Sequence, residues 1–378
     1  MNRNEQFSVL YRIAADSVHE AATVAQGIAV EQTLEFPIEL IKDRQLVDAV
    51  VGKLGEIALC DDRDGYLVWI SYNLEVVGAE FTQLLNVIFG NSSMQPGVWV
   101  EDLELPHSLL ASYKGPRFGV AGIRKLVAGT EGPLLQGAIK PLGSSVTALA
   151  RMAYDFARGG AHLIKDDHGI TDQQYAPFAE RVAACAEAVR QANDESGGHS
   201  VYIANCTADG EKVIERARLA KELGAGGIMV APGLIGYSQM KAIADDDTIG
   251  LPVIAHPTFQ GGFVLPSRSS GIRPAVLFGL LSRLAGADSV IFPSFGGRFA
   301  CGRDDCQKLA AATQRPMGHI RTNFPCPAGG LTEQTLPEIM SAYGENVIYL
   351  VGGGIFRHGS DLAENTTYFR NLISTVSN

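Results

Sequence analysis

Residues 159–168 read GGAHLIKDDH, and this stretch combines a structural pattern with a chemical one. The apolar residues before Lys165 are typical of a β-strand, and the strand ends in a lysine, two aspartates and His168. Burying a lysine beside acids at a strand end is costly, so the pattern indicates a prepared metal-binding or proton-transfer site. The four polar residues alone would fit a solvated loop of mixed charge equally well. Their place in the larger pattern favours the site.

Eight short apolar runs, separated by amphipathic stretches such as residues 144–159, predict the fold of most of the chain. The runs are 134–141 (LLQGAIKP), 162–168 (HLIKDDH), 201–207 (VYIANCT), 226–233 (GGIMVAPG), 252–258 (PVIAHPT), 289–295 (SVIFPSF), 322–330 (TNFPCPAGG) and 347–354 (VIYLVGGG). Nearly continuous apolar character is typical of parallel strands that are buried on both faces. Strand–helix units repeated in this way predict a C-terminal (β/α)8 TIM barrel, with the active site at the carboxyl ends of the strands. A doubly wound open sheet is the alternative, and the regular repetition favours closure.

The N-terminal part of the chain has a different pattern. Residues 7–13 and 65–72 resemble strands, and residues 17–27 and 81–89 resemble helices. We interpret residues 1–118 as a small α+β, ferredoxin-like domain and residues 119–378 as the catalytic barrel domain. The boundary lies near YKGPRFGV, a segment that contains glycine and proline.

Composition limits the classes of partner. A net charge of −10 argues against nucleic acid and against an anionic membrane surface. No uncharged apolar run approaches the roughly 18 residues of a membrane-spanning helix, and the N-terminal residues lack a signal-peptide pattern. The six cysteines are scattered without a CxxC pair, which is typical of reduced thiols in a cytoplasmic protein.

Polar residues follow several of the expected strands. Lys140 ends the first, Lys165 with Asp167 and His168 ends the second, and His256 ends the fifth. A lone histidine is often a hydrogen-bonded core residue, but this position at a strand end opposite two lysines favours an active-site role for His256.

Glycine clusters follow the last two strands. Ala328 precedes Gly329 and Gly330, and the last strand runs into Gly352 and Gly353. Bare backbone N–H groups at these barrel positions are typical of a phosphate site. Residues 295–302 (FGGRFACG) place glycines on both sides of Arg298, as in a closing loop that carries an anion-binding guanidinium, although an ordinary surface loop fits as well.

Taken together, GAIKP, GGAHLIKDDH, VIAHPT, the glycine loop, CPAGG and VGGG resemble the large subunit of ribulose-bisphosphate carboxylase (RuBisCO). IAVEQTLE with Glu31, IFGNSS with Asn91, and WVEDLELP resemble the N-terminal domain of that family, so the likeness covers nearly the whole chain.

The resemblance implies roles for individual residues. Lys165 would be carbamylated by CO2 and would bind Mg2+ together with Asp167 and residue 168, and Lys140 would move protons at the substrate carbons. Glu31 and Asn91 would be lent by one subunit to the barrel of its neighbour, which implies a homodimer with shared active sites.

The departures from the family pattern narrow the function. His168 stands in place of a metal-binding carboxylate, so another divalent ion could replace Mg2+. Leu142 replaces a lysine, and Pro257 and Ile291 replace an arginine and a histidine of one phosphate site. Arg298 replaces the lysine that steers CO2, so CO2 fixation is not expected. This profile is that of the RuBisCO-like (form IV) proteins.

We therefore expect an isomerase or lyase that acts on a phosphorylated ketose through a metal-stabilised enolate. The favoured reaction is isomerisation of 5-methylthioribulose 1-phosphate in methylthioadenosine and methionine salvage, because the enolase branch of the family carries a lysine at the position of Asn91. The alternatives are a diketo-methylthiopentyl-phosphate enolase and a decarboxylase or hydrolase of a 3-oxo sugar-acid phosphate. A catalytically silent metabolite sensor is an alternative of another class, motivated by the altered metal site.

Overall fold

The computed structural model describes residues 5–61, 64–264, 269–299 and 301–374, so Ala300 of the expected glycine loop lies outside it. The chain forms two compact units. The first comprises Met1–Tyr113, Gln260–Leu277 and Pro316–Ile320, and the second comprises Lys114–Phe259, Phe278–Arg315 and Arg321–Asn378. Each unit contains a β-sheet.

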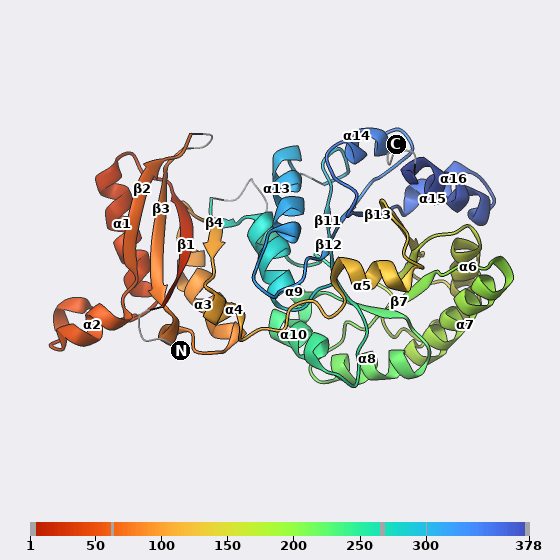
Figure 1. Cartoon of the computed structure of the whole chain (residues 1–378), viewed down its shortest axis with the longest axis horizontal. Helices are drawn as coiled ribbons and strands as arrows, with labels where there is room; N and C mark the ends of the chain where they lie inside the picture. Colours follow the sequence, from red (N-terminus) through yellow and green to blue (C-terminus); the bar gives the residue numbers. More distant parts are fainter. Residues whose placement is uncertain (1–4, 62–63, 265–268, 300, 375–378) are drawn as a thin grey trace. The chain divides into compact units, whose positions relative to one another are not determined.

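The second unit contains a nearly closed parallel barrel of eight strands, as the sequence predicts (Figure 1). Its hydrogen-bonded order is β12-β11-β9-β8-β7-β6-β5-β13. The strands are β5 (Leu134–Ile139), β6 (Leu163–Asp166), β7 (Val201–Asn205), β8 (Gly227–Val230), β9 (Val253–Ala255), β11 (Ser289–Pro293), β12 (Phe324–Ala328) and β13 (Ile348–Leu350). Each lies inside one of the apolar runs identified in the sequence.

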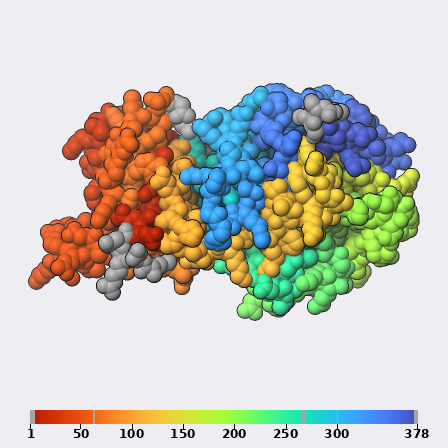
Figure 2. All heavy atoms as spheres, in the orientation of Figure 1, coloured from red at the N-terminus to blue at the C-terminus, as the bar shows by residue number. Residues whose placement is uncertain are grey.

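Helices cover the outside of this sheet, and Figure 2 shows the yellow-green atoms of α6 and α7 as part of the outer layer of the unit. The helices along this part of the chain are α5 (Gly119–Leu126), α6 (Val146–Arg158), α7 (Phe178–Ser196), α8 (Lys212–Glu222), α9 (Pro232–Ile235), α10 (Tyr237–Asp245), η4 (Ala275–Leu281, a π-helix), α12 (Ser282–Leu284), α13 (Arg303–Gln314), α14 (Leu336–Met340), α15 (Gly353–His358) and α16 (Leu362–Ser374). Helix α6 shows how the sequence produces one of these helices. The Ser145 hydroxyl caps its first turn by accepting from the Ala148 N–H, and Leu149, Ala153 and Phe156 are buried at helical spacing.

Alternate residues of the strands fill the interior of the barrel. Leu134 and Ala138 of β5, Leu163 of β6, and Val201 and Ile203 of β7 belong to one buried apolar cluster. Because side chains of a strand alternate between its two faces, Lys165 shares the inner face with Leu163, whereas Asp166 is directed to the outer layer. The two polar residues at the end of β6, Lys165 and Asp166, therefore lie on opposite faces of the strand.

The first unit contains a five-stranded sheet of order β10-β4-β1-β3-β2. Its elements are β1 (Gln6–Ile13), α1 (Val18–Glu31), η1 (Ile38–Leu40), α2 (Arg44–Val50), β2 (Lys53–Leu59), β3 (Tyr66–Asn73), η2 (Leu74–Val76), α3 (Phe81–Phe89), η3 (Asn91–Met94), β4 (Val98–Glu104), α4 (His107–Leu110), α11 (Gly261–Val264) and β10 (Gly271–Ile272). The predicted strands and helices are all present. The sequence pattern missed three strands: β2, whose residues are mostly exposed, β4, and β10, which pairs in parallel with β4 from far along the chain.

No helix in the described part of the chain is long and apolar enough to cross a membrane.

Asp288 lies just before β11, and its side chain accepts hydrogen bonds from two other backbone segments. One carboxylate oxygen accepts from the N–H groups of Phe118 and Gly119, both at 2.7 Å, and the other accepts from the Val253 N–H at 2.9 Å. The side chain is fully buried. The carboxylate therefore links the start of α5 to the start of β9.

Asp288→Asn is expected to lower the free energy of unfolding by about 2 kcal/mol or more, because the new amide group would face a backbone N–H and leave a buried donor unpaired. Thermal unfolding followed by far-ultraviolet circular dichroism measures the loss. Asp361→Asn is the control, since Asp361 is exposed and an asparagine there still accepts from the Glu364 N–H. Equal stability of the two variants would contradict this account of Asp288.

Candidate active site

Lys165 is a buried amine at the carboxyl end of β6. It lies between Ala138 of β5 and Ile203 of β7, and only 1% of the residue is exposed. Its Nζ donates a hydrogen bond to the Asp166 carbonyl at 2.9 Å. Burial lowers the pKa of Lys165 from 10.5 to about 8, with a further lowering by the charge of Lys140 that the nearby aspartates oppose. A substantial fraction of this amine is therefore neutral near physiological pH.

Asp167 is the carboxylate that faces this lysine. The chain leaves β6 at this point, and the Asp167 N–H donates to the Ile139 carbonyl at 3.2 Å. One carboxylate oxygen lies 3.7 Å from Lys140 Nζ, and the other lies 3.7 Å from His168 Nδ1. Burial alone would raise the pKa of Asp167, but the neighbouring His168 side chain and the charges of the two lysines hold it well below its usual range. Asp167 is therefore ionised.

His168 and His256 stack against each other across the site. Their ring centroids are 4.3 Å apart and the rings are nearly parallel. His256 Nδ1 accepts from the Thr258 N–H at 3.2 Å, which assigns the ring proton to Nε2. Burial, together with the charges of Lys165 and His168, lowers the pKa of His256 well below 6.5. His256 is therefore a neutral hydrogen-bond donor through Nε2.

The glycine turn after β12 lies against the loop that carries Arg298. The Arg298 N–H donates to the Gly329 carbonyl at 2.9 Å, and a Cβ on Gly330 would meet the Arg298 nitrogen at 3.1 Å. Both Gly329 and Gly330 have positive φ angles, which side chains other than glycine rarely adopt. Near the last strand, a Cβ on Gly352 would lie 3.1 Å from Lys140 Nζ. Glycine is thus what allows the Lys140 amine to approach this turn.

Glu31 and Asn91 lie in the first unit and contact each other. Glu31 is the last residue of α1, and its Oε1 accepts from Asn91 Nδ2 at 2.9 Å. The same Nδ2 donates to Glu35 Oε1, also at 2.9 Å. Sequence reasoning did not single out Glu35, which lies beyond the end of α1 and has a positive φ angle.

Comparison with known proteins identifies the family. Residues 119–371 match the catalytic domain of the ribulose bisphosphate carboxylase large chain. A 5-methylthioribulose-1-phosphate isomerase of Rhodospirillum rubrum is 38% identical over 97% of this chain and 95% of its own length. The chain belongs to the RuBisCO large-chain family.

Other members of the family are also similar over most of their length. A 2,3-diketo-5-methylthiopentyl-1-phosphate enolase of Geobacillus thermodenitrificans is 33% identical over 94% of this chain and 88% of its own. The crystal structure of a RuBisCO-like protein from Rhodopseudomonas palustris has a TM-score of 0.87 and 36% identity, with 99% of each chain covered. The resemblance to RuBisCO-like proteins that the sequence indicated is therefore confirmed.

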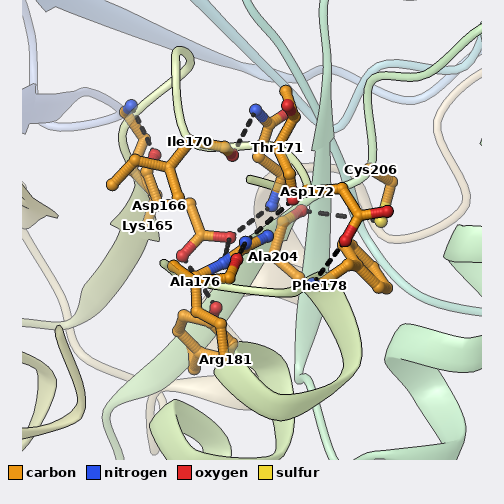
Figure 3. Close-up of polar contacts among 12 residues, drawn as sticks. Lys165, Asp166, Ile170, Thr171, Asp172, Ala176, Phe178, Arg181, Ala204 and Cys206 are labelled. Atoms are coloured by element: carbon orange, nitrogen blue, oxygen red, sulfur yellow. Dashed lines mark hydrogen bonds and ion pairs between the residues drawn. The ribbon is translucent and has the colours of Figure 1, made fainter. Parts of the chain in front are cut away.

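Four further residues in this RuBisCO-like chain form a buried hydrogen-bonded group on the outer side of β6. Asp166 is fully buried and accepts from Arg181 Nε at 3.2 Å (Figure 3) and from the Tyr202 hydroxyl at 2.8 Å. The N–H of Asn205 donates to the same carboxylate at 2.9 Å. Sequence reasoning did not single out Arg181 or Tyr202. Strand alternation could have separated Asp166 from Asp167, but nothing in the sequence identifies the partners of Asp166.

The resemblance to RuBisCO implies a bound metal ion, and the side chains around Lys165 are its possible ligands. The described residues include no group of three histidine, cysteine, aspartate or glutamate side chains that could hold a metal ion. Asp167 and His168 would supply two ligands, and a protonated lysine would supply none. A carbamate on the buried Lys165 would add the missing oxygen, so the residues present fit a divalent cation only together with that modification.

The reaction of Lys165 with a small electrophile is expected to accelerate as pH rises through about 8, because only the neutral amine is nucleophilic and its pKa is lowered to about 8. Trace labelling with acetic anhydride, a small neutral electrophile whose own reactivity does not change with pH, tests this in metal-free protein, with the modified site located by peptide mass spectrometry. Lys165→Met serves as the control for the modified peptide. A rate that is still rising at about pH 10, as for an unperturbed lysine, would contradict the lowered pKa.

Proposed function

We propose that this protein enolises a phosphorylated ketose, and that its reaction is the isomerisation of 5-methylthioribulose 1-phosphate in methionine salvage. The observation that carries the proposal is the buried, partly neutral Lys165 amine beside the ionised Asp167 and the second lysine, Lys140. This arrangement suits removal of a proton next to a carbonyl. The relative named as 5-methylthioribulose-1-phosphate isomerase supports the choice of substrate.

Lys165, Asp167 and His168 would hold the cation, with CO2 bound to Lys165 as a carbamate. Mg2+ is the metal implied by the resemblance, and the imidazole of His168 admits a softer ion such as Mn2+. When bound, the cation supplies positive charge that stabilises the enediolate oxygens of the substrate.

Proton movement is assigned to the two lysines. Lys140, about a third exposed, is more accessible than Lys165, and Asp167 lies 3.7 Å from its amine. Either Lys140 or carbamylated Lys165 would take the proton from carbon. Its return to the neighbouring carbon, with transfer of the hydroxyl proton to the former carbonyl oxygen, completes the isomerisation. His256, neutral with its proton on Nε2, would donate a hydrogen bond to a substrate oxygen.

The phosphate would be bound by the backbone at Ala328, Gly329, Gly330, Gly352 and Gly353, with Arg298 adding a positive charge. The contact between the Arg298 loop and the Gly329 carbonyl supports this assignment, because it brings the guanidinium-bearing segment to the glycine turn. Pro257 and the buried Ile291 carry no charge for a second phosphate. This favours a substrate with one phosphate and an apolar methylthio end.

Glu31 and Asn91 are proposed to complete the active site of a partner subunit in a homodimer. Their mutual hydrogen bond supports a joint role, since the amide fixes the Glu31 carboxylate. Domain boundaries near residue 118 and a cytoplasmic location remain predictions from the sequence.

Two alternatives remain testable. Relatives named as 2,3-diketo-5-methylthiopentyl-1-phosphate enolases favour enolisation of that diketone by the same residues. A silent sensor of a phosphorylated metabolite would need the phosphate site but neither lysine.

Nuclear magnetic resonance of 5-methylthioribulose 1-phosphate in D2O, with the protein, bicarbonate and Mg2+ or Mn2+, is expected to show an isomeric product and deuterium beside the carbonyl. Lys165→Ala should lose exchange by at least about 10³-fold while still binding the substrate, because the phosphate contacts remain. Turnover of the diketone alone would establish the enolase reaction instead. Binding without exchange in the unmodified protein would establish the sensor.

His168→Glu is expected to shift the metal preference towards Mg2+, because a carboxylate is a harder and more negative ligand than an imidazole. The ratio of kcat/KM with Mg2+ to that with Mn2+ should rise about tenfold or more. His168→Gln, which supplies neither charge nor imidazole, is the matched control. An unchanged ratio in His168→Glu would remove His168 from the metal site.

A further inference from the structure

Asn205, the last residue of β7, makes a set of contacts that the proposed chemistry does not explain. The residue is fully buried, and its side-chain Nδ2 donates to the carbonyls of His168 at 2.9 Å and Ile170 at 3.0 Å. Its Oδ1 accepts from the Thr207 N–H at 3.2 Å. Every hydrogen-bonding atom of this amide is therefore engaged, and both donated bonds reach the segment between β6 and α7.

That segment, residues 167–177, contains two of the three candidate metal ligands, Asp167 and His168. Arg181 of α7 holds its far half, because Nη1 donates to the carbonyls of Thr171 at 2.8 Å and Ala176 at 3.0 Å (Figure 3). Gln173 adds a bond from its side chain to the Gly169 carbonyl at 2.8 Å. The near half, where Asp167 and His168 lie, is held by Asn205.

Asp166 links these two anchors. Its Oδ2 accepts both from Arg181 Nε and from the Asn205 N–H, at 3.2 and 2.9 Å. The buried carboxylate thus fixes Arg181 and the backbone of Asn205 relative to β6. The Asn205 side chain then extends from this fixed point to the carbonyls of the loop.

We propose that Asn205 is a positioning residue, whose side-chain amide fixes the loop backbone so that the Asp167 carboxylate lies beside Lys140 and the His168 ring stacks on His256. The catalytic consequence rests on the proposed function, whereas the effect on the loop and on cation binding does not.

The physical reason is the cost of an unpaired carbonyl. Without the amide, the His168 and Ile170 carbonyls lose their donor inside the protein, and the segment must move to reach water or another donor. Asp167 moves with it, because its own carbonyl accepts from the Ile170 N–H at 3.0 Å. A displacement of about 1 Å in a catalytic group is enough to cost about 10²-fold in rate.

Asn205→Ala tests the proposal, with Asn323→Ala as the matched control. Asn323 is also fully buried and also donates from Nδ2 to a backbone carbonyl, that of Ala287 at 3.0 Å, but it precedes β12 at the opposite end of the barrel. Asn205→Ser is a milder variant if the alanine variant does not fold. Three properties are compared: amide hydrogen exchange of residues 167–177, Mn2+ affinity by electron paramagnetic resonance under bicarbonate, and steady-state kinetics.

In Asn205→Ala, exchange in residues 167–177 should become at least about tenfold faster, and Mn2+ binding at least about tenfold weaker. On the proposed substrate, kcat should fall about 10²-fold while KM changes less than about threefold, since the phosphate contacts are untouched. Asn323→Ala should lose thermal stability but keep all three properties.

Unchanged exchange in residues 167–177 would overturn the proposal, and so would faster exchange with unaltered Mn2+ affinity and kcat. Equal effects of the two alanine variants would reduce Asn205 to a stability residue. If the unmodified protein binds Mn2+ but does not turn over the substrate, the proposed reaction fails, and the positioning role is judged from exchange and Mn2+ affinity. If the unmodified protein neither binds Mn2+ nor turns over the substrate, amide exchange in residues 167–177 alone tests the positioning role.

Discussion

The buried ion pair between Asp166 and Arg181 lies behind the carboxyl end of β6, and the candidate site in front of that strand depends on it. Both side chains are fully shielded from water, so the pair is stable only while its hydrogen bonds to Tyr202 and Asn205 are also made. With Asp166 fixed on the outer face, the alternation of the strand directs Lys165 inward. The next residue, Asp167, then leaves the strand and turns over the end of the barrel.

Three charges in front of the strand set the chemistry. Lys165, in the apolar interior, loses part of its charge, whereas Asp167 keeps its own because Lys140 and His168 lie within 3.7 Å. A buried amine that is easily made neutral, next to a carboxylate that stays ionised, is suited to take up CO2 and then to hold a cation. The neutral His256 and the glycine turns add hydrogen-bond donors without adding acids. The proposed function therefore uses the same few groups for binding and for proton transfer.

The sequence predicted the barrel because eight apolar runs had to be buried on both faces, and it predicted Lys140, Lys165 and His256 because strand ends of a barrel converge. It could not predict the partners of Asp166. Arg181 lies 15 residues further along the chain and Asn205 lies 39 residues further, and only the packed fold brings them together. For the same reason β10 was missed: two residues pair with β4 across a separation that no local pattern encodes. Glu35 accepts a hydrogen bond from Asn91, and Glu35 itself has a positive φ angle, a backbone conformation that side-chain periodicity does not reveal.

The central claim is that Lys165 is an amine prepared to become a cation ligand. The most direct measurement is 13C nuclear magnetic resonance of the protein equilibrated with 13CO2, with and without a divalent cation. The account predicts one carbamate resonance that is absent from Lys165→Met and that is strengthened by the cation, because carbamate and metal stabilise each other. A spectrum identical to that of Lys165→Met, in the presence of the cation, would contradict it.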